Sequence, residues 1–165
     1  MAERFYLEEI YEQESWTVIL SNTDGIQERF FELVQAEIEK SEFPGLDITY
    51  NEYKTGGWIF DSEFTKMLKV APQKSQFKKF AILYRCQAFG NTVILSRYEC
   101  MAAGFFDTLT GKGGSEIYGL VREKCKNLAQ IEEFVAIDQL ADLVYDLACA
   151  QIDPEYRERK LLKDA

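Results

Sequence analysis

The chain contains no histidine, so the side chain that most often moves protons in enzymes is missing. Pairs of serine or cysteine with a histidine base are therefore excluded. The four cysteines are spread along the chain without a Cys-x-x-Cys pair, which gives no support to a zinc centre. An enzyme built on this sequence would depend on carboxylates, lysine, tyrosine, cysteine or a bound cofactor. We expect neither a metal centre nor a cofactor.

The sequence also lacks long apolar runs. None approaches the roughly 18 residues that a membrane span needs. The first residues, MAERFYLEEIYEQE, are acidic and have neither the basic region nor the apolar core of a secretion signal. The cysteine spacing resembles no secreted disulfide framework. These absences predict a cytoplasmic protein with reduced, mostly buried thiols and no contact with a membrane.

The composition is that of a packed globule. Of the 165 residues, 47 % are apolar and 14 % aromatic, which excludes a disordered chain and suffices for one substantial core. No repeat, low-complexity stretch or linker divides the sequence. We therefore expect residues 1–165 to form a single domain.

The net charge of −9 is unevenly distributed. Residues 1–53 carry −10, residues 54–126 carry +6 and residues 127–165 carry −5. The basic part is sharpest in KMLKVAPQKSQFKK (66–79), which has five lysines and no acidic residue. Such a stretch attracts phosphate, nucleic acid or an acidic protein surface. The pI near 4.7 argues against nucleic acid, and we favour a solvated connection offset by the acidic helices of the chain.

The clearest local pattern is a β-hairpin. Two runs rich in β-branched and aromatic residues, KFAILYRCQAF and TVILSRYECM, flank the turn pair Gly90-Asn91. In one register, a single face carries Ile82, Tyr84, Cys86, Ile94 and Tyr98. Arg97 and Glu99 then lie on the opposite face. A two-residue loop shifts the register by one and mixes these sets, and neither face is polar throughout.

The elements before the hairpin are less uniform. Residues 4–13 read as a short helix and residues 15–21 as a strand. A helix over 25–41 has an apolar stripe at helical spacing, and Asp24 is the expected N-cap. Residues 48–55 read as a strand.

A further strand begins at Trp58 and reaches about Phe64, where it bends or stops. Beyond it, Ala71-Pro72-Gln73 leads into the lysine-rich connection.

After the hairpin the pattern becomes helical. Asn127 is the expected N-cap of a long helix, with Gln130 at the capping-box position. Leu140 and Val144 lie at the centre of its apolar stripe and are expected to pack on the sheet. Asp153-Pro154 predicts the start of a last helix over 154–163.

This order of elements predicts the α+β class, with an antiparallel sheet of about four to five strands packed against a long C-terminal helix. The order resembles that of helix-grip and TATA-binding-protein-like sheets, although no residue motif of either family is present. Fold resemblance of this kind does not identify a function.

Aromatic side chains provide one candidate binding site. Five of them are candidates to line a cavity between the sheet and the long helix: Trp58, Tyr50, Tyr53, Tyr84 and Tyr98. Their hydroxyl groups would orient a small apolar or aromatic ligand. The same residues fill an ordinary core equally well, and we favour that interpretation.

A glycine-rich string provides the second candidate site. Gly111 to Ser115 precedes a short predicted helix, and the amides near Ser115 together with Lys112 suit an anion. The string is not a Walker loop, because six residues separate Gly104 from Gly111 and Lys112 is followed by glycine. A mobile connection is the simpler interpretation.

Three classes of function stay open. We favour a non-enzymatic interaction protein, such as an adaptor, inhibitor, immunity protein or chaperone-like binder. The reasons are the lack of histidine and of catalytic motifs, the acidic helices, and a sheet that is apolar on both faces. Its partner would be another protein or a second copy of the chain. The alternatives are a binder of a small apolar or aromatic ligand, and an enzyme that acts on an anionic substrate through residues 111–115.

Overall fold

The computed structural model describes residues 3–4, 10–54, 64–74, 77, 79–101 and 125–165. The strands are β1 (Glu3–Arg4), β2 (Ile10–Ile19), β3 (Leu46–Lys54), β4 (Phe64–Pro72), β5 (Phe80–Phe89) and β6 (Thr92–Met101). The helices are α1 (Ile26–Lys40), α3 (Leu128–Ile152) and α4 (Tyr156–Asp164).

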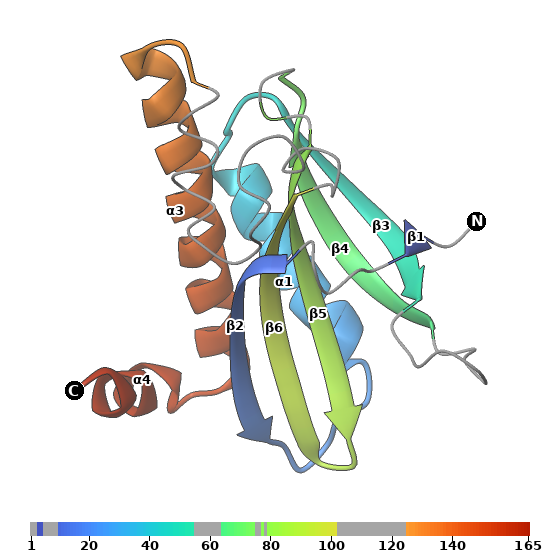
Figure 1. Cartoon of the computed structure of the whole chain (residues 1–165). Coiled ribbons are helices and arrows are strands. Elements are labelled where there is room, and N and C mark those ends of the chain that lie inside the picture. Colours follow the sequence, from blue (N-terminus) through green and yellow to red (C-terminus); the bar gives the residue numbers. More distant parts are fainter. Residues whose placement is uncertain (1–2, 5–9, 55–63, 75–76, 78, 102–124) are drawn as a thin grey trace.

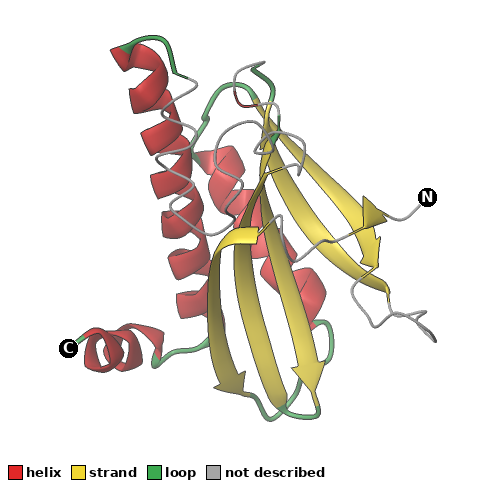
Figure 2. Cartoon of the chain, viewed as in Figure 1, coloured by secondary structure: helices red, strands yellow, loops and turns green. Residues whose placement is uncertain are grey.

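The strands form one sheet in the order β1-β3-β4-β5-β6-β2 (Figure 1). The five long strands are antiparallel to their neighbours, while the short β1 pairs parallel with β3. Helices α1 and α3 lie on the same side of the sheet and contact each other (Figure 2). The predicted α+β class, with its antiparallel sheet and long C-terminal helix, is confirmed. None of the described helices has the length and apolar character that a membrane span needs.

The hairpin forms where the sequence predicts it, with Gly90 and Asn91 as its two-residue loop. Gly90 has a φ of 62°, a backbone angle that glycine adopts without strain. Tyr84 faces Arg97 across the two strands, and Ile82 faces Glu99. The first register considered above is therefore wrong, and the register of the two-residue loop is the one observed.

The structure differs most from the sequence prediction at the start of β2. Residues 10–13, predicted as helix, belong to a strand that continues to Ile19 and pairs with β6. Residues 5–9 lie outside the described part of the chain. Because β2 lies along β6, Glu12 lies close to Asp138 of α3 and Glu14 lies close to Lys160 of α4. Both helices come from the other end of the chain.

The helices begin and end close to their predicted bounds. Gly25 is the N-cap of α1 with a left-handed φ of 68°, so the expected cap at Asp24 is wrong. The cap of α3 is confirmed, since Asn127 Oδ1 accepts a hydrogen bond from the Gln130 amide at 3.0 Å. The predicted last helix is α4.

The strand predicted from Trp58 to about Phe64 lies outside the described part of the chain except for Phe64 itself. Beyond Phe64 the chain is extended, because β4 covers Phe64–Pro72. Two residues of the lysine-rich stretch, Lys66 and Lys69, therefore stand on a strand. Lys74, beyond its end, pairs with Glu133 of α3 at 2.9 Å. This contact agrees with a connection whose charge the acidic helices offset.

The main core lies between the sheet and the two helices α1 and α3. Two tyrosines connect the layers: the Tyr84 hydroxyl donates to the Ala141 carbonyl at 2.9 Å, and the Tyr145 hydroxyl donates to the Leu95 carbonyl at 2.7 Å. Val144 is buried as predicted, while Leu140 is partly buried.

A second, smaller group of side chains is buried on the face of the sheet that points away from α1 and α3. It consists of Tyr53, Met67, Leu83, Tyr98 and Cys100, with Ile10 partly buried beside them. These side chains are buried within the single chain, so this part of the second face needs no partner subunit to cover it.

Candidate functional site

The aromatic residues predicted to share one cavity are not all brought together. Tyr84 is buried between the sheet and α3, whereas Tyr53 and Tyr98 are buried on the opposite face. Tyr50 is half exposed and donates its hydroxyl hydrogen bond to Gln35 of α1. The remaining predicted site residues, Trp58, Lys112 and Ser115, lie outside the described part of the chain.

The layer between the sheet and α3 is closely packed where the described residues enclose it. A cavity beside Tyr84 and Ala141 measures only about 10 Å³ and is almost entirely apolar in its lining. A volume of this size is at the lower limit for one water molecule. The cavity therefore has no room for an aromatic ligand.

Polar groups gather instead along the edge where β2 and β6 meet α3. We call this group the carboxylate seam, and it consists of Glu12, Glu14, Arg97, Glu99, Asp138, Asp142, Asp146 and Lys160. Strand pairing sets Glu14 beside Arg97 and Glu12 beside Glu99. The three aspartates follow one another at every fourth residue of α3, so they share one side of the helix. Six carboxyl groups thus meet two cationic groups.

Arg97 is the centre of the seam. Its Nη1 atom lies 2.7 Å from Glu99 Oε1, and its Nη2 atom lies 3.2 Å from Glu14 Oε2 and 3.5 Å from Asp142 Oδ1. Burial lowers the pKa of Arg97, but the carboxylates of Glu99 and Glu14 raise it by more. The guanidinium group therefore stays charged in the interior.

Glu99 is the most unusual group of the seam because its side chain is 0 % exposed. Burial, followed by the adjacent carboxyl of Asp138, raises the pKa of Glu99 to about 9, against the opposing effect of Arg97. One oxygen accepts the Arg97 bond, whereas Oε2 has no hydrogen-bond partner in the described structure. Two neighbouring carboxyl groups are both ionised at low cost only when a cation lies between them. Without a cation, the pair shares a proton.

The seam offers two groups of oxygen atoms to a metal ion. The carboxylate oxygens of Glu12, Glu99 and Asp138 lie within 4.8 Å of one another, and so do those of Glu14, Asp142 and Asp146. In the second group, Arg97 and Lys160 already compensate the charge. The first group has only the one contact between Arg97 and Glu99.

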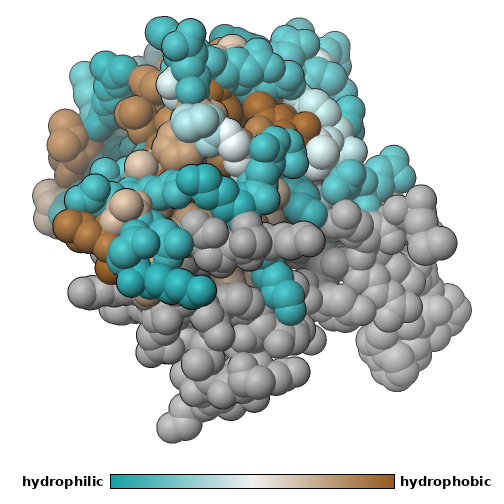
Figure 3. Space-filling model, turned by 90° about the horizontal axis from the view of Figure 1, so that it is seen from above, coloured by the Kyte–Doolittle hydropathy of each residue, from teal (hydrophilic) through white to brown (hydrophobic). Residues whose placement is uncertain are grey.

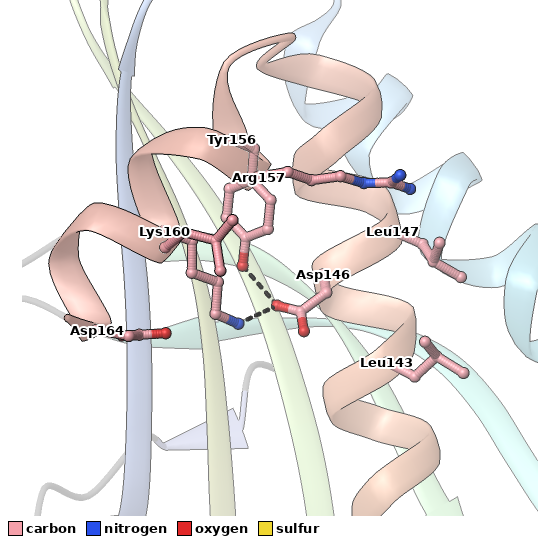
Figure 4. Close-up of a pocket in the computed structure, with 8 residues that line it drawn as sticks. Leu143, Asp146, Leu147, Tyr156, Arg157, Lys160 and Asp164 are labelled. Atoms are coloured by element: carbon pink, nitrogen blue, oxygen red, sulfur yellow. Dashed lines mark hydrogen bonds and ion pairs between the residues drawn. The ribbon is translucent and has the colours of Figure 1, made fainter.

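The lower end of the seam anchors α4. Lys160 Nζ lies 2.7 Å from Asp146 Oδ1 and 3.7 Å from Glu14 Oε1, and the Tyr156 hydroxyl donates to Asp146 as well (Figure 4). Burial, together with the hydrogen bond to Asp146, raises the pKa of Tyr156, so the hydroxyl keeps its proton. These contacts hold the first turns of α4 beside α3.

A cleft opens between α3 and α4 next to this anchor. It has a volume of about 430 Å³ and is lined by Leu143, Asp146, Leu147, Tyr156, Arg157, Lys160, Leu161 and Asp164 (Figure 4). Most of its lining surface is apolar, and the charged residues Asp146, Arg157, Lys160 and Asp164 contribute the rest together with the Tyr156 hydroxyl. We call it the α3–α4 cleft.

Exposed leucines surround the α3–α4 cleft. Leu143 of α3 is 55 % exposed, and the α4 residues Leu161 and Leu162 are 73 % and 79 % exposed. Viewed from above, apolar residues interrupt the hydrophilic surface on the left of the described part, the side on which α3 and α4 lie in Figure 1 (Figure 3). Leucines exposed at adjacent positions of two helices are typical of an interaction surface.

Comparisons with known proteins do not identify this chain. No protein-family model matches the chain, and no curated protein does. Among solved structures it is similar to the crystal structure of the Zhui aromatase/cyclase from Streptomyces sp. R1128, with a TM-score of 0.25 and 14 % identity. The similarity covers 86 % of this chain and 96 % of that chain. A likeness this low carries no argument about function, which has to come from the site itself.

Sequence reasoning missed both the seam and the cleft. It placed Arg97 and Glu99 opposite the apolar face because it considered the wrong hairpin register first, and it treated the start of β2 as a helix. The two-residue Gly90-Asn91 loop was the signal that would have set Arg97 and Glu99 toward α3. No comparable signal in the sequence places α4 beside α3.

Proposed function

We propose that this chain is a non-enzymatic interaction protein that acts as a dimer. In the dimer, the α3–α4 cleft of each copy receives α4 of the other copy. The observation that carries the proposal is the combination of an apolar cleft with a helix whose charges complement a second, antiparallel copy of itself.

The apolar contribution comes from leucines on both walls. Leu143 and Leu147 line the α3 side of the cleft, and Leu161 lines the α4 side. Leu162, next to Leu161, is almost fully exposed at the end of α4. Burying such side chains removes apolar surface from water and stabilises a complex by about 25 cal/mol for each Å² buried.

The charges at the two ends of α4 determine the orientation. Arg157 and Asp164 both line the cleft and are seven residues apart, which places them on the same side of the helix. Neither forms a salt bridge with another described residue. An antiparallel pair of α4 helices sets each Arg157 opposite the Asp164 of the other copy, with Leu161 near the two-fold axis. A surface that complements itself in this way suits a symmetric dimer.

Two further observations favour an interaction protein over the alternatives. Burial raises the pKa of the Cys86 thiol to about 12 and also raises the pKa of Cys149, so neither is a thiolate near neutral pH. The small volume beside Tyr84 gives no support to the alternative of an aromatic ligand between sheet and helix. The alternative of an enzyme that uses residues 111–115 lies outside the described part of the chain.

Sedimentation equilibrium of the full chain between about 1 and about 100 µM tests the proposal. A helix of nine residues forms a small interface, so we expect a dissociation constant in the micromolar range. We expect a monomer–dimer equilibrium that Leu161→Asp abolishes. Leu128→Asp is the matched control, since Leu128 is an exposed leucine of α3 about 22 Å along the helix from Leu143. A wild-type chain that stays monomeric over this range would overturn the proposal.

Charge exchange tests the antiparallel arrangement specifically. Arg157→Asp places two aspartates opposite each other at both ends of the helix pair and is expected to dissociate the dimer. Asp164→Arg should do the same with two arginines. The double variant Arg157→Asp/Asp164→Arg restores both opposite-charge pairs and should dimerise again. A double variant as monomeric as the two single variants would show that the helices do not pair in this way.

A further inference from the structure

Three carboxyl groups from three different elements converge at the upper end of the carboxylate seam. Glu12 comes from β2, Glu99 from β6 and Asp138 from α3, and their oxygens lie within 4.8 Å of one another. Strand pairing fixes Glu12 beside Glu99, and the packing of α3 on the sheet brings Asp138 to them. The arrangement is therefore held by the fold and does not depend on a loop.

The second observation is an unsatisfied atom in the middle of this group. Glu99 has no exposed surface, and its Oε2 atom has no hydrogen-bond partner among the described residues. A buried carboxyl oxygen without a hydrogen-bond partner destabilises the fold until a proton or a cation occupies it. Arg97 occupies only the other oxygen, Oε1. The free oxygen of Glu99 lies near carboxylate oxygens of Glu12 and Asp138, so a cation placed between them contacts all three groups.

The chemistry of the three groups determines which cation fits. All the ligand atoms are carboxylate oxygens, which hard divalent cations prefer. Zn²⁺ more often takes nitrogen and sulfur ligands. Ca²⁺ tolerates irregular arrangements of six to eight oxygens, including water, whereas Mg²⁺ needs a near-ideal octahedron. Glu12 is exposed and Asp138 is partly exposed, so an ion and its water molecules have a path from solvent to the buried Glu99.

We propose that Glu12, Glu99 and Asp138 form a binding site for a hard divalent cation, with Ca²⁺ as the best fit. The ion takes the vacant Oε2 of Glu99, one oxygen each from Glu12 and Asp138, and water molecules on the open side. It connects β2, β6 and α3 at one point. No local sequence pattern predicts this site, because its ligands are far apart along the chain.

The experiment is a calorimetric titration of the full chain with CaCl₂, combined with thermal unfolding at about 5 mM CaCl₂ and in EDTA. We expect saturable binding of one ion and a rise in melting temperature of a few degrees. Glu12→Gln should weaken Ca²⁺ binding about ten-fold or more, because it removes one charged ligand. Glu12 is exposed, so this variant tests the site without disturbing the core.

Two further variants separate the site from general effects of charge. Glu133→Gln removes one charge from α3 outside the seam and should bind Ca²⁺ like the wild type. Glu99→Gln should fold, because an amide at this position donates a hydrogen bond to Asp138, yet it should lose the stabilisation by Ca²⁺. No binding at about 5 mM CaCl₂ would overturn the proposal. Equal stabilisation by NaCl of the same ionic strength, or equal loss in Glu133→Gln and Glu12→Gln, would overturn it as well.

Discussion

Arg97 contacts the carboxyl groups of Glu14, Glu99 and Asp142, and its side chain is only 8 % exposed. A buried arginine of this kind seldom increases stability beyond what an apolar residue of similar size would give, because removing its charge from water is costly. Removing it alone, however, would leave the buried Glu99 without its cationic partner and take one cationic contact from the partly exposed Glu14 and Asp142. Arg97 therefore fixes the arrangement of the seam more than it adds to the stability of the fold.

The thiols give the first prediction at the scale of single residues. Cys86, Cys100 and Cys149 are buried, while Cys125 is partly exposed. With the pKa of Cys86 at about 12, only about one thiol in ten thousand is ionised at pH 8. We expect one of the four thiols to react rapidly with a disulfide reagent at pH 8 and the other three to react only as the chain unfolds.

The control for the thiol prediction is Cys125→Ser, which should remove the rapid phase and leave the slow one unchanged. Full denaturation should release all four thiols in the wild type and three in the variant. Two or more rapid thiols in the native wild type would contradict the burial described above. The measurement needs only the absorbance of the released chromophore with time.

Single residues also show where the sequence stops being informative. The pairing of Asn127 with Gln130 is local, so the sequence predicted it correctly. The bond from Trp16 Nε1 to Asp153 Oδ2, at 2.9 Å, connects residues from opposite ends of the chain. Such a contact depends on the whole fold, and no local pattern predicts it. The seam was missed for the same reason.

At the scale of elements, the prediction of α3 succeeded and that of the start of β2 failed. The apolar stripe of α3 has helical spacing over 25 residues, which few other structures accommodate. The start of β2 is rich in glutamate, which strands disfavour, and it becomes a strand because β6 offers it a partner. Tertiary pairing overrides local preference at this position. The sequence therefore predicted the class of the fold and most of its elements, but not this edge.

The packing of α3 gives a prediction at this scale. Ile137 is 2 % exposed and faces the sheet, whereas Leu143 lines the α3–α4 cleft. Ile137→Ala should lower the free energy of unfolding by about 2–5 kcal/mol, since it leaves a cavity in a packed core. Leu143→Ala on the same helix should cost less than about 0.5 kcal/mol in the monomer. Urea denaturation at low protein concentration measures both.

Equal losses from the two variants would contradict this description of α3. If both losses were small, the apolar stripe would not pack on the sheet. If both were large, Leu143 would be part of the core and the α3–α4 cleft would not be an open surface.

At the scale of the whole molecule, the fold combines a local hairpin with a distant strand. Ala88 pairs with Val93 across a two-residue loop, whereas Val18 pairs with Val93 from 75 positions earlier in the chain. Closing a long segment costs more conformational entropy than closing a hairpin. We therefore expect the β5–β6 hairpin to form early in folding and β2 to join late.

Stopped-flow kinetics test this order of events. Val18→Ala, which removes about 1.5 kcal/mol of apolar burial, should raise the unfolding rate about ten-fold and change the refolding rate by less than about two-fold. Ile82→Ala in the hairpin should mainly slow refolding. A Val18→Ala variant that refolds slowly and unfolds normally would show that β2 belongs to the folding nucleus.

The position of α4 has one more consequence. β2 is the last strand of the described sheet, and a bare outer strand is a template on which other chains can add strands and aggregate. Arg159 of α4 donates to the Thr17 carbonyl at 3.2 Å and lies over the Trp16 ring, so the helix shields this border. Loss of α4 would therefore appear first as fibrous or amorphous aggregation, and only second as a lower melting temperature. The last helix thus covers the edge of a strand that lies near the start of the sequence.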